Sequence, residues 1–206
     1  MVIDLSKLSL VGVGSSISYE SLVSISQIVR NSFLGFVDRV EIQEPMLHAQ
    51  GLDLESIDVS LERIDVRLMA SILRERYDQN TLGVIDADLR TDQTDQFYGY
   101  LFGAYDPERN VAMVSTSRLA PLNFEQEADT QKFVSRIAKV GLHEVGHGLG
   151  FRDHYSYQTA QDGTLCPMTR GEYNKFGQIG YIRSIVDQRG FQFCDECTLY
   201  TNLGNR

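Results

Sequence analysis

The chain has 206 residues, of which 42% are apolar and 23% are charged, as in a soluble globular protein. This length predicts one domain over residues 1–206, either of ordinary shape or with a deep cleft between two lobes. The net charge of −9 argues against nucleic acid and anionic membranes as partners. The sequence has no long apolar run and no N-terminus that resembles a secretory signal, so we expect a cytoplasmic protein.

The first part of the chain alternates strand and helix patterns. Strands are predicted over residues 9–13, 36–43 and 81–87, and helices over residues 18–36 and 57–77. Ser18 is the expected N-cap of the first helix. Gly12 and Gly14 resemble half of a phosphate-binding loop, but the third glycine and the lysine of such loops are missing. We therefore interpret them as an ordinary strand-to-helix turn.

Two other features of this part could suggest a metal site. Four aspartates lie close together in the sequence, Asp86, Asp88, Asp92 and Asp95. Their spacing lacks the glycine and the final glutamate of a calcium-binding EF-hand loop, so a solvated loop is the better interpretation. His48 stands alone in a stretch bounded by proline and glycine, and we expect it at the surface.

Two further strands are predicted over residues 97–105 and 111–119. The five residues between them are few enough for an antiparallel hairpin. The second strand is the last before the long helix that follows. If it forms the edge of the sheet above a cleft, its free backbone groups could pair with an extended peptide.

The long helix begins near residues 125–129 and ends in the sequence His143-Glu144-Val145-Gly146-His147-Gly148-Leu149-Gly150. Histidines four residues apart on a helix lie about 40° apart around its axis and about 6 Å apart along it, so both imidazoles can meet one metal ion. Glu144 projects away from this pair, close enough to act as a general base. This is the HExxH pattern of zinc hydrolases.

The next ligand requires the helix to end. Residue 153 of a continued helix would lie about 15 Å from His143 along the axis, too far to share an ion. Gly148 and Gly150 permit backbone conformations that let the chain fold back beneath the metal. The residue brought there is Asp153, and a carboxylate is an acceptable third zinc ligand.

The last segment contains a second set of metal-binding residues. Cys194 and Cys197 form a C-x-x-C pair, and Cys166 is the third thiol of the chain. With His154 they make three thiolates and one imidazole, a closed structural zinc shell. The alternative is one buried thiol and a redox pair. Because neighbouring side chains of an extended segment point to opposite sides, Asp153 would serve the first ion and His154 the second.

These motifs resemble those of the archaemetzincins, a branch of the metzincin zinc peptidases. The family pattern HExxHxxGxxHC, C-x-M and C-x-x-C corresponds to residues 143–154, to Cys166 and Met168, and to the last two cysteines. The resemblance covers residues 80–200 well, including strands at 83–89 and 114–119. Asp153 departs from the third histidine of the family, and His154 departs from its cysteine. The loop between His154 and Cys166 is also longer than usual.

The resemblance implies a zincin-like α/β (α+β) fold. We expect a mixed, twisted sheet with an antiparallel edge strand, a backing helix and an active-site helix in an upper part of about residues 1–150. A small lower part of about residues 151–206, with a helix near 178–189, would hold the structural zinc. Met168 would form the Met-turn, an apolar floor under the metal.

The function expected from this resemblance is hydrolysis of peptides or small proteins by a zinc peptidase with Glu144 as general base. Two zinc ions per monomeric chain are expected, one catalytic and one structural. Tyr155, Tyr157 and Tyr173 are candidates for an oxyanion donor. An anionic third ligand predicts weak or narrow activity. The alternative is an inactive zinc-binding module of the same fold that holds a peptide without cutting it.

Overall fold

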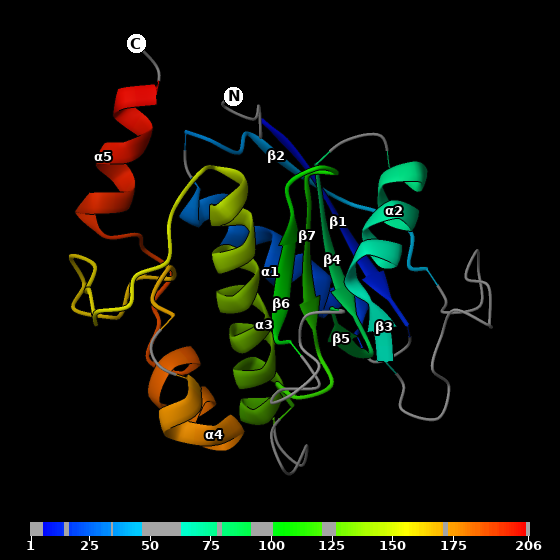
Figure 1. Cartoon of the computed structure of the whole chain (residues 1–206). Helices are drawn as coiled ribbons and strands as arrows, with labels where there is room; N and C mark the ends of the chain where they lie inside the picture. Colours follow the sequence, from blue (N-terminus) through cyan, green and yellow to red (C-terminus); the bar gives the residue numbers. More distant parts are fainter. Residues whose placement is uncertain are drawn as a thin grey trace.

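A computed structural model describes residues 6–14, 17–33, 35–46, 63–77, 80–91, 101–120, 127–170 and 173–204 (Figure 1). Several predicted features lie outside these ranges: His48, Asp92, Asp95, residues 57–62 of the second predicted helix, residues 97–100 of a predicted strand, and residues 125–126 at the predicted start of the long helix.

The main sheet has five strands in the order β2-β1-β4-β7-β6. Their bounds are Lys7–Val13 for β1, Arg39–Ile42 for β2, Asn80–Ile85 for β4, Gly103–Asp106 for β6 and Val111–Ser115 for β7. The first four strands in this order are parallel, and β6 pairs antiparallel with β7. The expected mixed sheet with an antiparallel edge strand is therefore confirmed. Two short parallel strands, β3 (Arg63–Asp65) and β5 (Asp88–Arg90), form a separate small sheet.

The predicted hairpin is confirmed, but its second strand does not meet the condition set for pairing with a peptide, because it is not an edge strand. β7 lies inside the sheet between β4 and β6, and β6 forms the edge. All five residues of β7 are buried, whereas three of the four residues of β6 are only half-buried. A continuous buried apolar run is typical of an interior strand covered on both faces. Of the two strands of the hairpin, β6 is therefore the one with an edge that an added strand could pair with.

Helices cover both faces of the main sheet (Figure 1). α1 (Tyr19–Ser32) and α3 (Glu127–Gly148) share one apolar core with the sheet, and α2 (Val66–Arg76) shares a second core with the opposite face. Ser18 caps α1 as predicted, since its side chain accepts a hydrogen bond from the Ser21 backbone N–H. Asp65 caps α2 in the same way, through the backbone N–H groups of residues 67 and 68.

The C-terminal segment lies on the side of α3 away from the sheet (Figure 1). It contains α4 (Tyr173–Tyr181), the π-helix η3 (Ile182–Val186) and α5 (Asp195–Gly204). The helix predicted near 178–189 is thus interrupted, with Gly177 at φ +62° and a change of helix type after Tyr181. Tyr181, Ile185 and both cysteines at 194 and 197 join the core of α1 and α3. Within the described ranges, no helix combines the length and apolar character needed to cross a bilayer.

Candidate metal centres and the cleft

The C-terminal half of α3 is buried on nearly all sides. Residues 140–146 are all buried, because the sheet covers one side of the helix and the C-terminal segment covers the other. A helix apolar all around is typical of the interior of a protein. His143 and Glu144 are therefore fixed on a rigid element in surroundings of low polarity, with only 8% of each residue exposed.

The two histidines of α3 direct one ring nitrogen each toward a common point. Their Nε2 atoms lie 3.3 Å apart. Nδ1 of His143 lies 2.9 Å from the Pro167 carbonyl oxygen, and Nδ1 of His147 lies 3.1 Å from that of Phe151. Since a carbonyl oxygen can only accept, each Nδ1 carries the proton and each neutral ring presents an Nε2 lone pair. Such backbone contacts orient histidines for metal binding.

The chain turns back after α3 as the glycines predict. Gly150 has φ +86°, and the backbone N–H of Phe151 donates to the Gly146 carbonyl oxygen, which closes the helix end. This turn brings Asp153 beneath the histidine pair. Its Oδ1 lies 3.2 Å from Nε2 of His143 and 3.4 Å from Nε2 of His147.

These three atoms fit a zinc ion. Bonds of about 2.0–2.1 Å in a tetrahedron place ligand atoms about 3.3 Å apart, close to the three distances observed. Asp153 Oδ1 is also a buried oxygen without a hydrogen-bond donor. Two nitrogen lone pairs and one carboxylate oxygen facing each other repel unless a cation lies between them. The donor set therefore suits a divalent metal with a fourth position open to the cleft.

The charge states of these groups favour metal binding. Burial lowers the pKa of His143 to about 4, so its imidazole is neutral at pH 7. Burial opposes ionisation of Asp153, but a proton on either imidazole would donate to this carboxylate and hold its pKa well below its usual range. Burial also opposes protonation of His147, yet the nearby carboxylates raise its pKa overall.

The second oxygen of Asp153 binds an arginine. Oδ2 lies 3.1 Å from Nη1 of Arg170, whose side chain is 58% exposed. Arg170 also lies over the ring of Tyr155, with its Nη1 3.5 Å from the hydroxyl. One carboxylate oxygen therefore faces the histidines and the other faces a cation. Arg170 offsets part of the negative charge that distinguishes this centre from one with three histidines.

Glu144 extends from α3 toward the edge strand β6. A Cβ atom placed on Gly103 would lie 2.7 Å from Oε1 of Glu144, so glycine is needed for this approach. Burial raises the pKa of Glu144 to about 7. A carboxyl group with this pKa can accept and return a proton near neutral pH.

Met168 lies beneath the same end of the helix. It is fully buried, and its Sδ atom would be 2.5 Å from a Cβ placed on Gly146. The helix and the methionine can approach this closely because residue 146 has no side chain. Pro167, the residue before, supplies the carbonyl oxygen that orients His143.

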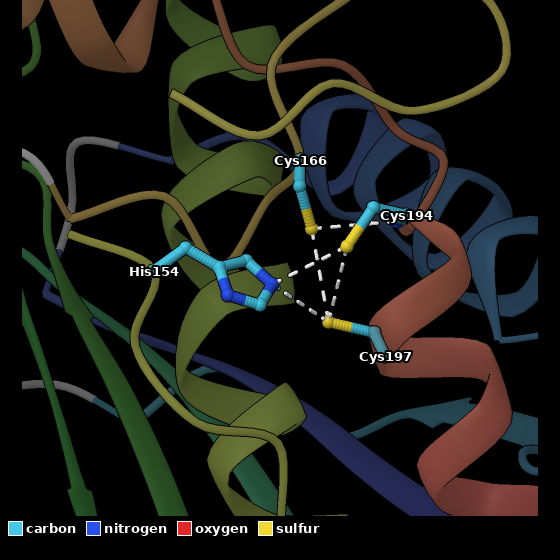
Figure 2. A group of neighbouring side chains, drawn as sticks. All are labelled: His154, Cys166, Cys194 and Cys197. Atoms are coloured by element: carbon cyan, nitrogen blue, oxygen red, sulfur yellow. Dashed lines mark hydrogen bonds between the residues drawn. The ribbon is translucent and has the colours of Figure 1, made fainter. Parts of the chain in front are cut away.

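The second cluster consists of His154, Cys166, Cys194 and Cys197, all buried (Figure 2). Nε2 of His154 lies 3.3 Å from Sγ of Cys194 and 3.2 Å from Sγ of Cys197. Sγ of Cys197 lies 3.8 Å from each of the other two sulfurs. Zinc–sulfur bonds of about 2.3 Å give a tetrahedral edge of about 3.8 Å, so this cluster also fits zinc.

The ionisation of one thiol in this cluster strongly affects the pKa of its neighbour. A hydrogen bond with Cys197 lowers the pKa of Cys166 to about 5, and the same contact raises the pKa of Cys197. One thiolate thus forms at the expense of the next when no cation is present. Cys194 immediately precedes α5 and Cys197 lies in its first turn, where the positive end of the helix favours thiolates.

Backbone pairing joins the two clusters. The backbone N–H of His154 donates to the Met168 carbonyl oxygen, and that of Arg170 donates to the His154 carbonyl oxygen, both at 2.9 Å. Asp153 faces the histidine pair while His154 faces the cysteines, as the alternation of side chains predicts. All seven residues predicted as ligands are brought together in two groups.

A cavity of about 230 Å³ opens in front of the first cluster. Its walls include Phe102 and Gly103 beside β6, the two histidines and Glu144 of α3, Asp153, and Tyr181 at the end of α4. Arg170 and Arg189 complete its charged lining. Sequence reasoning missed Tyr181 and both arginines, because no spacing relates them to the histidines and only the folded chain brings them there.

Two of the three predicted tyrosine candidates are less favourably placed than Tyr181. Tyr155 and Tyr157 are 67% and 54% exposed, and neither lines the cavity. The side chain of Tyr173 lies outside the described part of the structure. Asp88, one of the four clustered aspartates, forms an ion pair of 2.6 Å with Arg118, which gives this carboxylate a structural partner.

Comparison with solved structures identifies the fold. The archaemetzincin of Methanopyrus kandleri superposes with a TM-score of 0.69 at 20% sequence identity, covering 97% of this chain and 94% of that one. A zinc-dependent peptidase from Methanocorpusculum labreanum gives 0.67 at 19% identity, with 94% and 100% covered. The chain has an archaemetzincin-like fold. The archaemetzincin of Archaeoglobus fulgidus, complexed with malonate, gives 0.59 at 18% identity, with 94% and 98% covered.

No protein-family model and no curated protein sequence matches the chain. The similarity to these proteins is therefore detected in the three-dimensional structure and not by comparison of whole sequences. The superposition extends over nearly the whole length, including the first 80 residues, where the motifs gave little indication.

Proposed function

We propose that the chain is a zinc-dependent peptidase. The single observation that carries this proposal is the arrangement around the cavity: two Nε2 lone pairs and Asp153 Oδ1 converge at zinc-binding distances, and Glu144 lies in the same cavity. A metal-binding site used only for stability is closed by four protein ligands, whereas this one has three and faces a cleft. The zinc-peptidase neighbours share the fold that presents these groups.

Zinc held by His143, His147 and Asp153 would supply Lewis-acid chemistry, polarising the peptide carbonyl and making water more acidic. Glu144 takes a proton from the attacking water and returns it to the leaving amine. Its pKa of about 7, raised by burial, suits both steps. The Tyr181 hydroxyl lines the cavity and donates a hydrogen bond to the carbonyl oxygen as negative charge develops there.

The edge strand β6 is the proposed support for an extended substrate. It pairs with β7 on one side only among the described strands, and Gly103 brings its backbone close to Glu144. Backbone hydrogen bonds along such an edge bind peptides with little dependence on their side chains. Peptides or small proteins are therefore the proposed substrates.

Two zinc ions per chain are proposed. The second, held by His154 and the three cysteines, would be structural, since four ligands close its coordination. It would stabilise the segment that carries Asp153. Met168 is proposed as the Met-turn residue, providing an apolar floor beneath the histidine pair.

A peptide-holding module without hydrolysis is the second candidate. The observation that favours it is Asp153, since an anionic ligand reduces the residual charge of the ion and hence its power as a Lewis acid. Arg170 acts in the opposite direction by pairing with the same carboxylate. A group with a raised pKa at the position of Glu144 is expected of a catalyst, and a site that only binds gains nothing from it.

Replacing Glu144 by alanine tests the proposal. Hydrolysis of a quenched fluorescent peptide library should fall at least about 100-fold, because general-base catalysis contributes about 10² to 10⁴. Zinc content should stay unchanged, since Glu144 is not a ligand. The matched control is Glu108→Ala, which removes a carboxylate whose side chain is 83% exposed in the hairpin turn. Equal hydrolysis by the Glu144→Ala and wild-type proteins would overturn the mechanism.

A further inference from the structure

Arg189 is a buried cation in the cavity wall, and no carboxylate of the described residues pairs with it. Only 3% of the residue is exposed. Its Nε and Nη2 both donate to the Thr169 carbonyl oxygen, at 2.9 and 2.6 Å, and Nη2 also lies 3.4 Å from the Tyr181 hydroxyl. The remaining group, Nη1, has no acceptor among the described residues, yet it is not sealed off by protein atoms.

The other arginines near the site are matched by acids. Arg170 pairs with Asp153, and Arg136, which is 7% exposed, pairs with Asp187 at 2.7 Å. A guanidinium away from water is costly unless an anion or several acceptors satisfy it. For Arg189 the described protein supplies a carbonyl and a hydroxyl but no anion. The cavity is the direction from which an anion can come.

The charges around Arg189 support this assignment. Glu144 and Asp153 line the same cavity but neither comes within ion-pair distance of the guanidinium, and Asp153 is already shared by Arg170 and the histidines. With one bound Zn²⁺, the two arginines and the two carboxylates of its lining, the cavity would carry a net positive charge. The whole chain carries −9, so attraction of an anion here is local and works against the average field.

We propose that Arg189 binds a carboxylate of the substrate next to the scissile bond. The proposal rests on the proposed function and names its substrate class, acidic peptides. The Nη1 group of a buried guanidinium held in place by its other hydrogen bonds can form a strong, directional contact with a carboxylate. The carboxylate is either the side chain of aspartate or glutamate or the C-terminal carboxylate of a short peptide, and the contact is the same in both.

The test measures binding as well as cleavage. The probes are alanine pentapeptides, blocked as acetyl and amide, in which each position in turn carries glutamate or glutamine. A second pair differs only in a free or an amidated C-terminus. Binding to zinc-loaded Glu144→Ala protein is measured by calorimetry, and cleavage of the same peptides by wild-type protein is followed by mass spectrometry.

Glutamate should bind about tenfold or more tightly than glutamine at one position only, or the free acid should bind by this factor more tightly than the amide. The first result assigns a side chain and the second assigns the terminal carboxylate. Equal binding within each pair at all positions overturns the proposal, and this comparison needs no change to Arg189.

A carboxylate could also be attracted by zinc itself, so Arg189→Gln in the same background is the decisive arm. It should reduce the acid preference to less than about twofold, while Arg183→Gln, an exposed arginine on η3, should leave it unchanged. If the Arg189→Gln variant still binds the acidic peptides more tightly than their amide counterparts, another cation is responsible and the proposal is overturned. Arg189→Lys, which keeps the charge, should restore part of it.

The outcomes separate this inference from the proposed function. Acid-selective binding without any cleavage by wild-type protein would leave the carboxylate site intact and contradict the peptidase proposal. Efficient cleavage with no preference for acids would support the peptidase and overturn the role of Arg189.

Discussion

Asp153 is the residue on which the chemistry of the centre depends most. Its two oxygens have separate environments: Oδ1 meets both imidazoles, and Oδ2 meets Arg170. A histidine in its place would be neutral and would not bind the arginine. If Asp153 is the third ligand, Arg170 places a cation beside it, and the net charge of the centre differs less from that of a three-histidine centre than Asp153 alone implies.

We predict that Asp153→Ala loses the weaker-bound zinc, because two histidines alone leave the ion without a third protein ligand. Asp153→His should hold zinc at least as tightly as wild type. Chelator competition measures both affinities. Unchanged zinc affinity in the alanine variant would show that Asp153 is not a ligand.

Arg170→Met provides the matched control for this prediction. In wild type it should weaken zinc binding only a few-fold, since an exposed ion pair contributes little. In the Asp153→His background the same change should have no effect, because its partner is absent. Equal effects in both backgrounds would mean that Arg170 does not act through Asp153.

At the scale of elements, the approach of β6 to α3 positions Glu144, the proposed base. A Cβ on Gly103 would meet Oε1 of Glu144 at 2.7 Å and Cγ1 of Val140 at 2.8 Å. Both neighbours are side chains on one face of α3, and the helix backbone is fixed by burial on all sides. A side chain at position 103 would therefore displace the carboxylate of Glu144 rather than the helix backbone.

Gly103→Ala should therefore displace Glu144 and reduce peptide hydrolysis about 10- to 100-fold, because a shift of about 1 Å in a catalytic group can cost this much. Zinc content should be unchanged. Ala104→Gly, a change of one methyl group at the next residue of β6, serves as control and should leave hydrolysis close to wild type. Normal activity of Gly103→Ala would show that β6 does not constrain Glu144.

The ion pair between Arg136 and Asp187 connects α3 with the segment after η3. Arg136 donates Nε and Nη2 to the two carboxylate oxygens, at 2.7 and 2.8 Å. Burial alone would raise the pKa of the Asp187 carboxyl, but Arg136 outweighs it and lowers this pKa. The stabilisation is thus present above the unfolded pKa of about 3.9 and is lost as pH falls through the lower folded value.

Asp187→Asn should lower the free energy of unfolding at pH 7 by about 2 kcal/mol, because Arg136 keeps a hydrogen-bond acceptor but loses the charge of its partner. The difference in Tm between variant and wild type should shrink as pH falls from 5 toward about 3. Thermal unfolding across this range measures it, with the exposed Asp38→Asn as control. A difference independent of pH would contradict the assigned ionisation.

At the scale of the whole molecule, the cysteine cluster joins distant parts of the chain. His154 follows the turn after α3, Cys166 precedes Met168, and Cys194 and Cys197 belong to the start of α5. The thiols also lie in the same apolar core as α1 and α3. Loss of this cluster should therefore affect the stability of the molecule as well as its local geometry.

Cys194→Ser should release one zinc per chain and lower the Tm. A structural zinc contributes directly to folding, and a loss of about 3 kcal/mol corresponds to about 6–12 °C for a chain of this size. Elemental analysis and calorimetry provide the measurements. Full zinc content with unchanged Tm would show that the cluster is not a structural zinc site.

The fold class was predicted through the resemblance to the archaemetzincins, and the residues that form the two clusters were predicted from local spacing and residue type. Helical periodicity placed His143 and His147 together, and the glycines after them indicated the turn to Asp153. Three thiols and one imidazole make a complete set of four zinc ligands, which predicted the second cluster. The single domain, the monomeric state, the cytoplasmic location and the count of two zinc ions stay predictions.

The remaining features depend on contacts that spacing does not contain. The sequence left open which strand of the hairpin forms the edge, because strand order depends on which strands pair across the sheet, and in the structure β6 lies outside β7. Tyr181 and Arg189 reach the cavity from a segment about 40 residues beyond the histidines, and no periodicity relates them to the motif. The kink at Gly177 and the π-helix likewise have no signal in the spacing of the residues.

The central claim, that the histidine–aspartate centre binds the zinc that drives hydrolysis, is tested most directly by returning zinc stepwise to metal-depleted wild-type protein. The first equivalent should enter the cysteine cluster and raise the Tm without producing peptide hydrolysis. Hydrolysis should appear only with the second equivalent, which fills the three-ligand centre. Hydrolysis that rises in proportion to the first equivalent, or that is the same with and without zinc, would contradict this claim.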